Sequence, residues 1–180
     1  MNENIVRPML LSSEIYRIRV DEDKWIVIIS LLNGEPFELF TIEDNSTIEI
    51  NVINGDVRIT KNEFYEPQFN FEYINSQGKL IKIADISKNK NREFGNYGLF
   101  ITAMLQDKKP ISYIIRVLDK LEPDNDRINS WMFGVKRALK KYIPDGKKIY
   151  PKECPNCRNN AMLYNGGCSI CTECGWSECG

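Results

Sequence analysis

The sequence predicts an α+β protein with an antiparallel, β-rich first region, two to three packed helices and a small cysteine-rich module at the end. Apolar and polar residues alternate through much of residues 14–85, as in strands. From residue 95 onward, apolar residues recur at the spacing of helices. All six cysteines lie in residues 154–180. We therefore expect an α+β body over residues 1–148 and a separate tail over residues 149–180.

The first three expected strands form a meander. Residues 14–20 alternate apolar and charged side chains, as a half-buried strand does. After a turn at residues 21–23, residues 24–32 form a nearly continuous apolar run, which is typical of a central strand. Residues 36–41 return after Asn33-Gly34, a pair that favours a tight hairpin turn.

Two further hairpins are expected in the next part of the chain. One joins residues 47–53 to residues 56–60 through Asn54-Gly55, because alternating sequence flanks this turn signal on both sides. The other joins residues 69–73 to residues 79–83 through a polar turn that contains glycine.

Three helices are expected between about residues 96 and 143. The first is a short apolar segment at residues 97–106. Pro110 suits the first turn of the second helix, whose apolar residues follow the i, i+3, i+4, i+7 spacing. Asp126 can cap the third helix, which continues to Ile143 with the same period.

The composition of the chain excludes several functional classes. Among its 180 residues, 27% are charged, and the formal net charge of −1 does not favour a nucleic-acid or membrane partner. The absence of histidine excludes imidazole catalysis and Cys–His nucleophile pairs. The polar first residues are unlike a signal peptide, and no apolar run approaches the roughly 20 residues of a membrane span. We expect a reducing, cytoplasmic location without membrane contact.

Two clusters of side chains each have two interpretations. Residues 136–152 hold seven basic residues and one acid, which form either a docking surface for phosphate groups or a solvated helix face. The aromatic cluster forms either a base-stacking platform or core and cross-strand packing. We expect the solvated face and the packing, because few basic residues lie among the aromatic ones. The aromatic residues are Phe64, Tyr65, Phe69, Phe71 and Tyr73.

The cysteines include two CxxC pairs, Cys154 with Cys157 and Cys171 with Cys174, separated by thirteen residues. Each pair can form a knuckle that turns two thiolates towards one point, and two knuckles complete a tetrahedral site for zinc. Gly175 suits the tight backbone of the second knuckle. Because four sulfur ligands close the coordination sphere, we expect a structural zinc ion in a four-cysteine zinc ribbon.

The tail, CPNC…GGCSICTECGWSECG, resembles the cysteine-rich carboxy terminus of adenosylcobalamin-dependent (class II) ribonucleotide reductases. There a CPxC knuckle precedes a GCxxCxxCG(Y/W)SxCG ending. Residues 110–147 resemble the helices before that tail, and residues 24–40 resemble strands that precede them. These 180 residues are too few for the family's catalytic barrel, with its radical cysteine and cobalamin site. The resemblance therefore implies an accessory carboxy-terminal component that is not catalytic alone.

The resemblance also implies a thiol relay in a ribonucleoside-diphosphate reductase, an oxidoreductase of deoxyribonucleotide synthesis for DNA replication. Redox-active Cys168 and Cys179 would take over a disulfide from the catalytic chain and be re-reduced by a thioredoxin- or glutaredoxin-like donor. Cys179 is expected to be mobile, and Cys168 follows the flexible Gly166-Gly167. Adenosylcobalamin would be bound only by the separate catalytic subunit.

Two alternatives stay open. The CxxxxC pair of Cys174 and Cys179 also resembles the shuttle pair of other ribonucleotide reductases. The second alternative is a zinc-ribbon module that binds nucleic acid or a protein partner and has no redox role. We prefer zinc on the two CxxC pairs, because CxxCG is the more regular knuckle. If Cys174 is a shuttle residue, the zinc ligands become Cys154, Cys157, Cys168 and Cys171.

Overall fold

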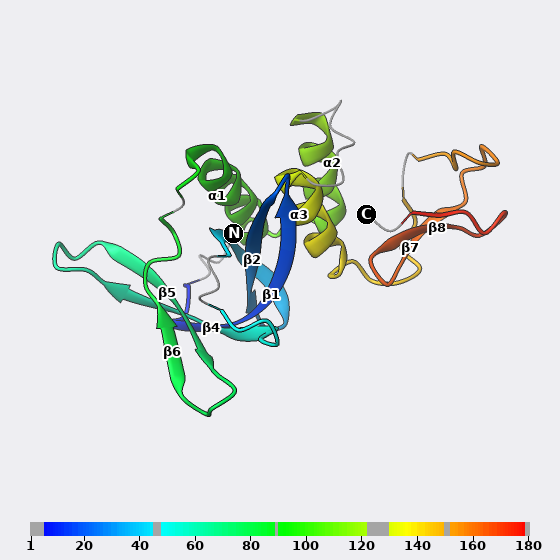
Figure 1. Cartoon of the computed structure of the whole chain (residues 1–180). Coiled ribbons are helices and arrows are strands. Elements are labelled where there is room, and N and C mark those ends of the chain that lie inside the picture. Colours follow the sequence, from blue (N-terminus) through cyan, green and yellow to red (C-terminus); the bar gives the residue numbers. More distant parts are fainter. Residues whose placement is uncertain (1–5, 45–47, 89, 122–129, 150–151, 179–180) are drawn as a thin grey trace. The chain divides into compact units, whose positions relative to one another are not determined.

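A computed structural model describes the chain over residues 6–44, 48–88, 90–121, 130–149 and 152–178 (Figure 1). The chain forms two compact units, residues 1–108 and residues 109–180. Together they have the predicted α+β composition, with antiparallel sheets, three helices and a cysteine cluster near the carboxy terminus. No helix in the described ranges combines the length and the apolar character that crossing a membrane requires.

The first unit is built on a six-stranded antiparallel sheet with the strand order β3-β2-β1-β4-β5-β6 (Figure 1). The long strand β1 lies inside the sheet, because its residues 13–20 pair with β2 and its residues 10–14 pair with β4. The strands are β1 (Leu10–Val20), β2 (Asp23–Leu32), β3 (Glu35–Glu43), β4 (Asn54–Lys61), β5 (Pro67–Ile74) and β6 (Leu80–Ile83).

Strands β1, β2 and β3 form the predicted meander. Asp21, Asn33 and Gly34 turn the chain with φ angles of 52°, 55° and 84°, and the last two suit a type I′ hairpin. In β2, every residue from Trp25 to Ser30 is buried, so both faces of this strand are covered. The apolar run therefore predicted its central position correctly.

The predicted hairpin at Asn54-Gly55 is wrong. Both residues begin β4, where Asn54 pairs with Glu14 of β1, and residues 48–53 form no strand. Gly55 is required by a close approach between strands. A Cβ atom at this position would lie 2.6 Å from the ring of Phe71 and 2.6 Å from the carbonyl oxygen of Glu72. Asn-Gly is a residue pair that favours a turn, but in this protein it lies inside the sheet, at a position where neighbouring strands are closely packed.

The predicted strands at residues 69–73 and 79–83 correspond to β5 and β6 and pair as a hairpin. Most of the aromatic cluster packs in or against the core of the first unit, as expected. Phe71 and Tyr73 are buried, and Phe69 packs against the core from its edge. Phe64 and Tyr65 differ, because they are exposed at the turn between β4 and β5.

Helix α1 (Arg92–Gln106) covers the edge strand β3 (Figure 1). Its first turn is capped by the side chain of Asn91, which accepts hydrogen bonds from two backbone N–H groups. The Thr102 hydroxyl accepts a hydrogen bond from the Leu39 N–H at 3.0 Å and donates to the Leu39 carbonyl at 3.3 Å. The helix thereby satisfies backbone groups that an edge strand would otherwise leave unpaired.

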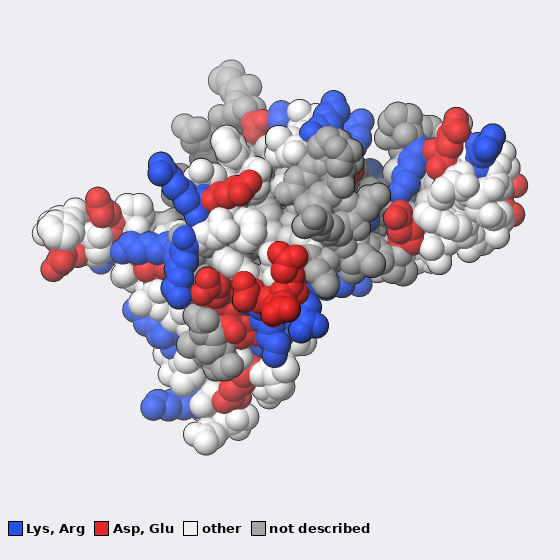
Figure 2. Space-filling model, turned by 45° about the horizontal axis from the view of Figure 1, so that its top comes forward, with Lys and Arg blue, Asp and Glu red and all other residues white. Residues whose placement is uncertain are grey.

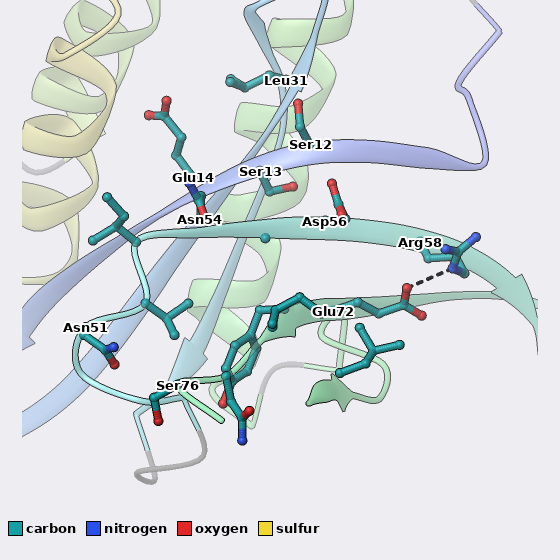
Figure 3. A pocket seen from close by; sticks show the side chains of 17 residues that line it. Ser12, Ser13, Glu14, Leu31, Asn51, Asn54, Asp56, Arg58, Glu72 and Ser76 are labelled. Atoms are coloured by element: carbon teal, nitrogen blue, oxygen red, sulfur yellow. Dashed lines mark hydrogen bonds and ion pairs between the residues drawn. The ribbon is translucent and has the colours of Figure 1, made fainter. Parts of the chain in front are cut away.

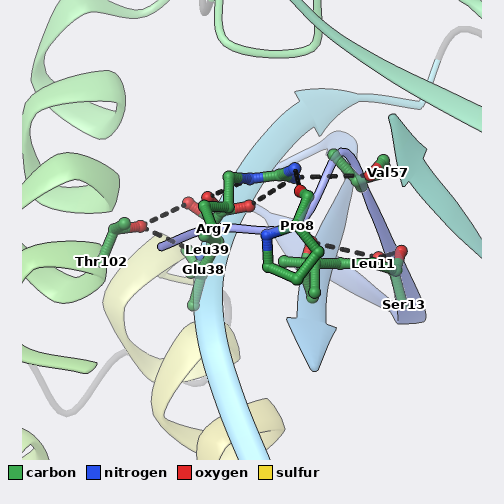
Figure 4. A network of polar contacts seen from close by, with 9 residues as sticks. Arg7, Pro8, Leu11, Ser13, Glu38, Leu39, Val57 and Thr102 are labelled. Atoms are coloured by element: carbon green, nitrogen blue, oxygen red, sulfur yellow. Dashed lines mark hydrogen bonds and ion pairs between the residues drawn. The ribbon is translucent and has the colours of Figure 1, made fainter. Parts of the chain in front are cut away.

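An ion pair between a half-buried arginine and a buried glutamate attaches the segment before β1 to the sheet (Figure 4). Two nitrogens of Arg7 contact the two carboxylate oxygens of Glu38 at 2.6 Å and 2.9 Å. Glu38 lies on β3 and is only 2% exposed. The guanidinium group also donates to the Val57 carbonyl of β4 and lies over the ring of Phe69. One side chain therefore connects three strands of the sheet.

The second unit contains two helices and a three-stranded sheet with the order β7-β8-β9. The third predicted helix is shorter than expected. It begins after Ser130, whose hydroxyl accepts from the Phe133 N–H, and the proposed cap Asp126 lies outside the described residues. The elements are α2 (Ile111–Leu121), α3 (Trp131–Lys140), β7 (Met162–Asn165), β8 (Cys168–Cys171) and β9 (Ser177–Glu178).

The helices and the cysteine-rich tail pack together within the second unit. Tyr164 of β7 is buried against Ile115 and Ile143. The segment after α3 also runs along β7, where Tyr164 exchanges backbone hydrogen bonds with Gly146 and Lys147 at 2.8 Å and 2.9 Å. The expected division at residues 148 and 149 falls within this paired segment. The compact units divide between Lys108 and Lys109, and the division into a body and a tail stays a prediction.

Candidate metal centre

The two CxxC pairs come together in the second unit. The sulfur atoms of Cys154, Cys157, Cys171 and Cys174 all lie within 4.8 Å of one another. The distance is 3.6 Å between Cys154 and Cys174 and 3.6 Å between Cys157 and Cys171. A zinc ion about 2.3 Å from four tetrahedral sulfurs holds them about 3.8 Å apart. The cluster is therefore compatible with a tetrahedral metal ion such as zinc.

The two knuckles share one backbone geometry. The N–H of Arg158 donates to the Cys154 carbonyl at 2.8 Å, and the N–H of Gly175 donates to the Cys171 carbonyl at 3.0 Å. The N–H of each first cysteine in turn donates to the carbonyl five residues later, at 3.0 Å and 2.7 Å. This repeat turns each pair of thiols towards the same point from opposite sides.

The residue after each CxxC pair adopts a left-handed conformation. Gly175 has a φ of 74°, which agrees with the conformation expected from the sequence. Arg158 takes the equivalent place in the first knuckle with a φ of 60°. An arginine does not indicate a left-handed backbone conformation, so the conformation of Arg158 could not be predicted from the sequence.

The cluster is buried on one side and open on the other. Cys154 and Cys171 are buried, Cys157 is half-buried and Cys174 is exposed. Met162, Ile149 and Trp176 are among the side chains that pack around the two buried thiols. The apolar cover limits water on one side of the cluster, while Cys174 remains accessible from the other.

The thiols of the metal-free cluster differ in acidity. The Asn156 side chain and the backbone N–H of Trp176 donate hydrogen bonds that lower the pKa of Cys174 to about 6. A backbone hydrogen bond at Asn159 lowers the pKa of Cys157, but partial burial and hydrogen bonds with the other thiols outweigh it and raise the pKa to about 12. Because a metal ion binds thiolates, it must displace protons from this cluster, which makes metal binding dependent on pH.

Cys168 stands apart from the four-thiol cluster. It begins β8, is half-buried and is disulfide-bonded, whereas the four cluster cysteines are free thiols. Cys168 and Cys171 are three residues apart on one strand, so their side chains point to opposite faces. The alternative ligand set, with Cys168 in place of Cys174, is thus not the one that the fold brings together. Cys179 lies outside the described residues.

Several lysines of the basic stretch make contacts within the second unit. Lys136 Nζ lies 2.7 Å from Asp119 Oδ1, and Lys152 Nζ lies 2.8 Å from Glu178 Oε2. Lys141 donates to the Gly166 carbonyl at 3.2 Å. On the face shown in Figure 2, basic and acidic side chains lie next to one another. The stretch therefore forms a partly neutralised surface, close to the solvated helix face that we expected.

The first unit contains an open cavity of about 760 Å³ between β1, β4 and the turn before β6 (Figure 3). Its lining is mostly polar. Arg58 donates to Glu72 at 3.0 Å, and Glu14 accepts from the Tyr16 hydroxyl at 2.6 Å. Three of the charged side chains that line the cavity are thus engaged within the protein. None of the cysteines lines this cavity.

Sequence reasoning missed two contributors to the cysteine site. Asn156 acts on Cys174 of the other knuckle through its side chain. Its position inside the first CxxC loop was the available signal, because a polar side chain there lies near the thiols. Glu178 fixes the last strand through Lys152, and no local pattern pairs these two residues, which are far apart in the sequence.

Comparison with known families supplies an independent result. The family model of the NrdJ homologue C-terminal domain matches residues 11–144. The matched range ends before the first cysteine. Comparisons with curated proteins and with solved structures found no match. Because the matched range covers most of the 180 residues, the chain belongs to the family of NrdJ homologue C-terminal domains and is thereby related to ribonucleotide reductases.

Proposed function

We propose that this chain relays reducing equivalents to the catalytic subunit of a class II-like ribonucleotide reductase. Family membership supports the ribonucleotide reductase-related role. The observation that carries the relay is the separation of the cysteines into two sets. Four free thiols form a cluster suited to a metal ion, while Cys168 is disulfide-bonded and lies outside the cluster. The four-thiol cluster can stabilise the fold, while the cysteines outside it exchange electrons.

The metal part of the proposal is a structural zinc ion on Cys154, Cys157, Cys171 and Cys174. Four sulfur ligands leave no coordination position open for a substrate or an activated water. The four thiolates would hold the ion, which would supply a cross-link between the two knuckles. The buried thiols and the repeated backbone hydrogen bonds position the ligands for this purpose.

The redox part of the proposal uses Cys168 and Cys179. In the reduced chain, one thiolate of this pair attacks the disulfide of the catalytic subunit and forms a mixed disulfide, releasing one thiolate of that subunit. The second thiolate of the pair then attacks the mixed disulfide and releases the other thiolate. The catalytic subunit gains two electrons, and the relay pair becomes a disulfide. A dithiol donor of the thioredoxin or glutaredoxin type reverses the oxidation by the same two exchanges, and adenosylcobalamin acts only on the catalytic subunit.

The test compares two reductants in turnover assays with the catalytic subunit. Cys168→Ser and Cys179→Ser should each abolish turnover supported by a thioredoxin and spare turnover driven by a small dithiol that reaches the catalytic subunit directly. Both variants should retain one zinc ion per chain. Equal loss of activity with both reductants would rule out the relay. Full thioredoxin-supported activity in both variants would favour a zinc-ribbon binding module instead.

A further inference from the structure

Three lysines of the second unit surround two carboxylates. Lys136 and Lys140 are four residues apart on α3 and share a helix face, and Lys152 follows in the segment before the first knuckle. Asp119 of α2 binds Lys136 at 2.7 Å, and Glu178 of β9 binds Lys152 at 2.8 Å. We refer to Lys136, Lys140 and Lys152 as the lysine cluster.

The lysine cluster has one more ammonium group than it has carboxylates. Lys140 is half-buried, and no hydrogen bond or ion pair engages its ammonium group within the described part of the chain. Burial lowers the pKa of Lys140. The neighbouring lysines also lower this pKa, whereas the two carboxylates raise it. Glu178 in turn experiences the positive charge of all three lysines. One additional carboxylate would balance the charge of this group.

Glu178 belongs to the element of the second unit with the smallest pairing surface. Strand β9 has two residues, and its pairs with β8 are Ser169 with Glu178 and Ile170 with Ser177. Both residues of β9 are exposed. The ion pair with Lys152 adds a side-chain attachment to this short backbone pairing, and an anion that competes for Lys152 would remove it.

We propose that the lysine cluster is a docking site for an acidic, carboxylate-bearing segment of a protein partner, and that Glu178 occupies part of this site in the free chain. The anions already bound there are side-chain carboxylates at 2.7 Å and 2.8 Å from the ammonium nitrogens, so the spacing of the lysines suits this group. Charge complementarity selects an acidic partner. The incoming carboxylate contacts Lys140 and competes with Glu178 for Lys152.

Docking has a specific consequence if the relay proposed above is correct. Strand β9 pairs with β8, the strand that begins with Cys168. Displacing the Glu178 carboxylate from Lys152 removes one side-chain attachment of β9 and leaves only its short backbone pairing with β8, which eases access to this cysteine. The partner is then an acidic protein that exchanges thiols with the relay pair. Only this use of the site depends on the proposed function; the binding itself does not.

The first experiment measures binding of a fluorescently labelled hexaglutamate peptide by anisotropy at low salt. Lys140→Gln should weaken binding about fivefold, which corresponds to about 1 kcal/mol for one partly exposed ion pair. Lys148→Gln is the matched control, because it removes the same charge from an exposed residue of the second unit outside the cluster. Equal effects of the two substitutions would mean that the peptide responds to overall charge, which would overturn the proposal.

A second pair of variants tests the competition by Glu178. Glu178→Gln removes the internal carboxylate and should tighten peptide binding, whereas Glu173→Gln, an exposed glutamate of the same tail, should change it less than about twofold. Unchanged binding in Glu178→Gln would overturn the proposal even if Lys140→Gln fails to fold. A single-stranded oligonucleotide of equal charge that binds more tightly than the peptide, with the same dependence on Lys140, would identify a nucleic-acid surface and also overturn it. The assays need no turnover, so a failed relay leaves their outcome readable.

Discussion

At the scale of single residues, Cys174 combines exposure with unusual acidity. Hydrogen bonds from Asn156 and from the Trp176 backbone lower the pKa of this thiol to about 6, and its side chain is open to solvent. Cys157 has the opposite property, because its pKa is raised to about 12. The thiolate is the nucleophile in alkylation, so the two residues should react at very different rates in the metal-free protein.

We therefore expect iodoacetamide to label Cys174 faster than Cys157 in the metal-free chain at neutral pH. The rate at Cys174 should fall as the pH falls through about 6, because the thiolate is then protonated. Peptide mapping by mass spectrometry after brief labelling measures both rates. Zinc added before the reagent should protect both cysteines. Faster labelling of Cys157 would contradict the hydrogen-bond assignments around the cluster.

The identities of the residues predicted the four-cysteine cluster but not the backbone conformation and the ion pair around it. Four cysteines at CxxC spacing predicted the cluster, since the knuckle is a local structure. Arg158 gave no sign of its left-handed backbone, which is imposed by the hydrogen bonds around Cys154. Glu178 and Lys152 meet only because β9 pairs with β8. Contacts between distant residues such as these cannot be read from local patterns.

At the scale of elements, a glycine in β4 and a glycine in α1 show that glycine can serve close packing as well as a turn. The sequence pattern predicts Gly55 in a turn, but this residue lies in β4 opposite Ser13 of β1. The chain requires glycine there because Phe71 of β5 crosses directly over the backbone. Gly98 of α1 faces β3 less closely, since a Cβ atom there would lie 3.5 Å from the Leu39 carbonyl oxygen.

Alanine substitutions at these two glycines should have opposite effects on stability. Gly55→Ala should lower the free energy of unfolding by about 1–3 kcal/mol, because the added methyl group forces the Phe71 ring and the strand apart. Gly98→Ala should be neutral or raise it by up to about 1 kcal/mol, because alanine favours the helix and fits the available space. Urea denaturation measures both. A Gly55→Ala variant as stable as the parent would contradict the tight approach of β4 and β5.

The elements that the sequence predicted correctly are those governed by neighbouring residues. The meander follows from hairpin turns and alternating side chains, and α2 and α3 follow from their apolar spacing. Helix α1 begins at Arg92, before the apolar segment that predicted it. The pairing of β1 with β4 joins residues about forty positions apart and has no local signal. The pattern also gave no sign that Ser130 caps α3 or that this helix ends at Lys140.

At the scale of the whole molecule, the family match and the compact units do not coincide. The match covers residues 11–144, which includes most of the first unit and both helices of the second. The helices of the second unit nevertheless pack with the cysteine-rich tail through Tyr164. A metal ion held by the four thiols should therefore stabilise the second unit, whereas the first unit has a separate core.

Removal of the zinc ion that we propose for this cluster should accordingly affect one unit. After treatment of the full chain with a chelator, hydrogen exchange should accelerate strongly in residues 152–178 and moderately in α2 and α3. Residues 6–44 should keep their protection, because the first unit buries its own apolar residues. The zinc-loaded chain and a Cys168→Ser variant, which retains the four ligands, serve as controls. Equal acceleration in both units would mean that the chain unfolds as one cooperative body.

The position of β1 also sets an order of events during folding. Its pairing with β2 closes a loop of two residues, whereas its pairing with β4 must wait until the intervening meander strands have been placed. Short loops close at a lower entropic cost, so β1, β2 and β3 should assemble before β4, β5 and β6 join the open edge of β1. On the ribosome, β1, β2 and β3 would then be folded while β4, β5 and β6 are still being synthesised. During this time the edge of β1 that pairs with β4 would be exposed.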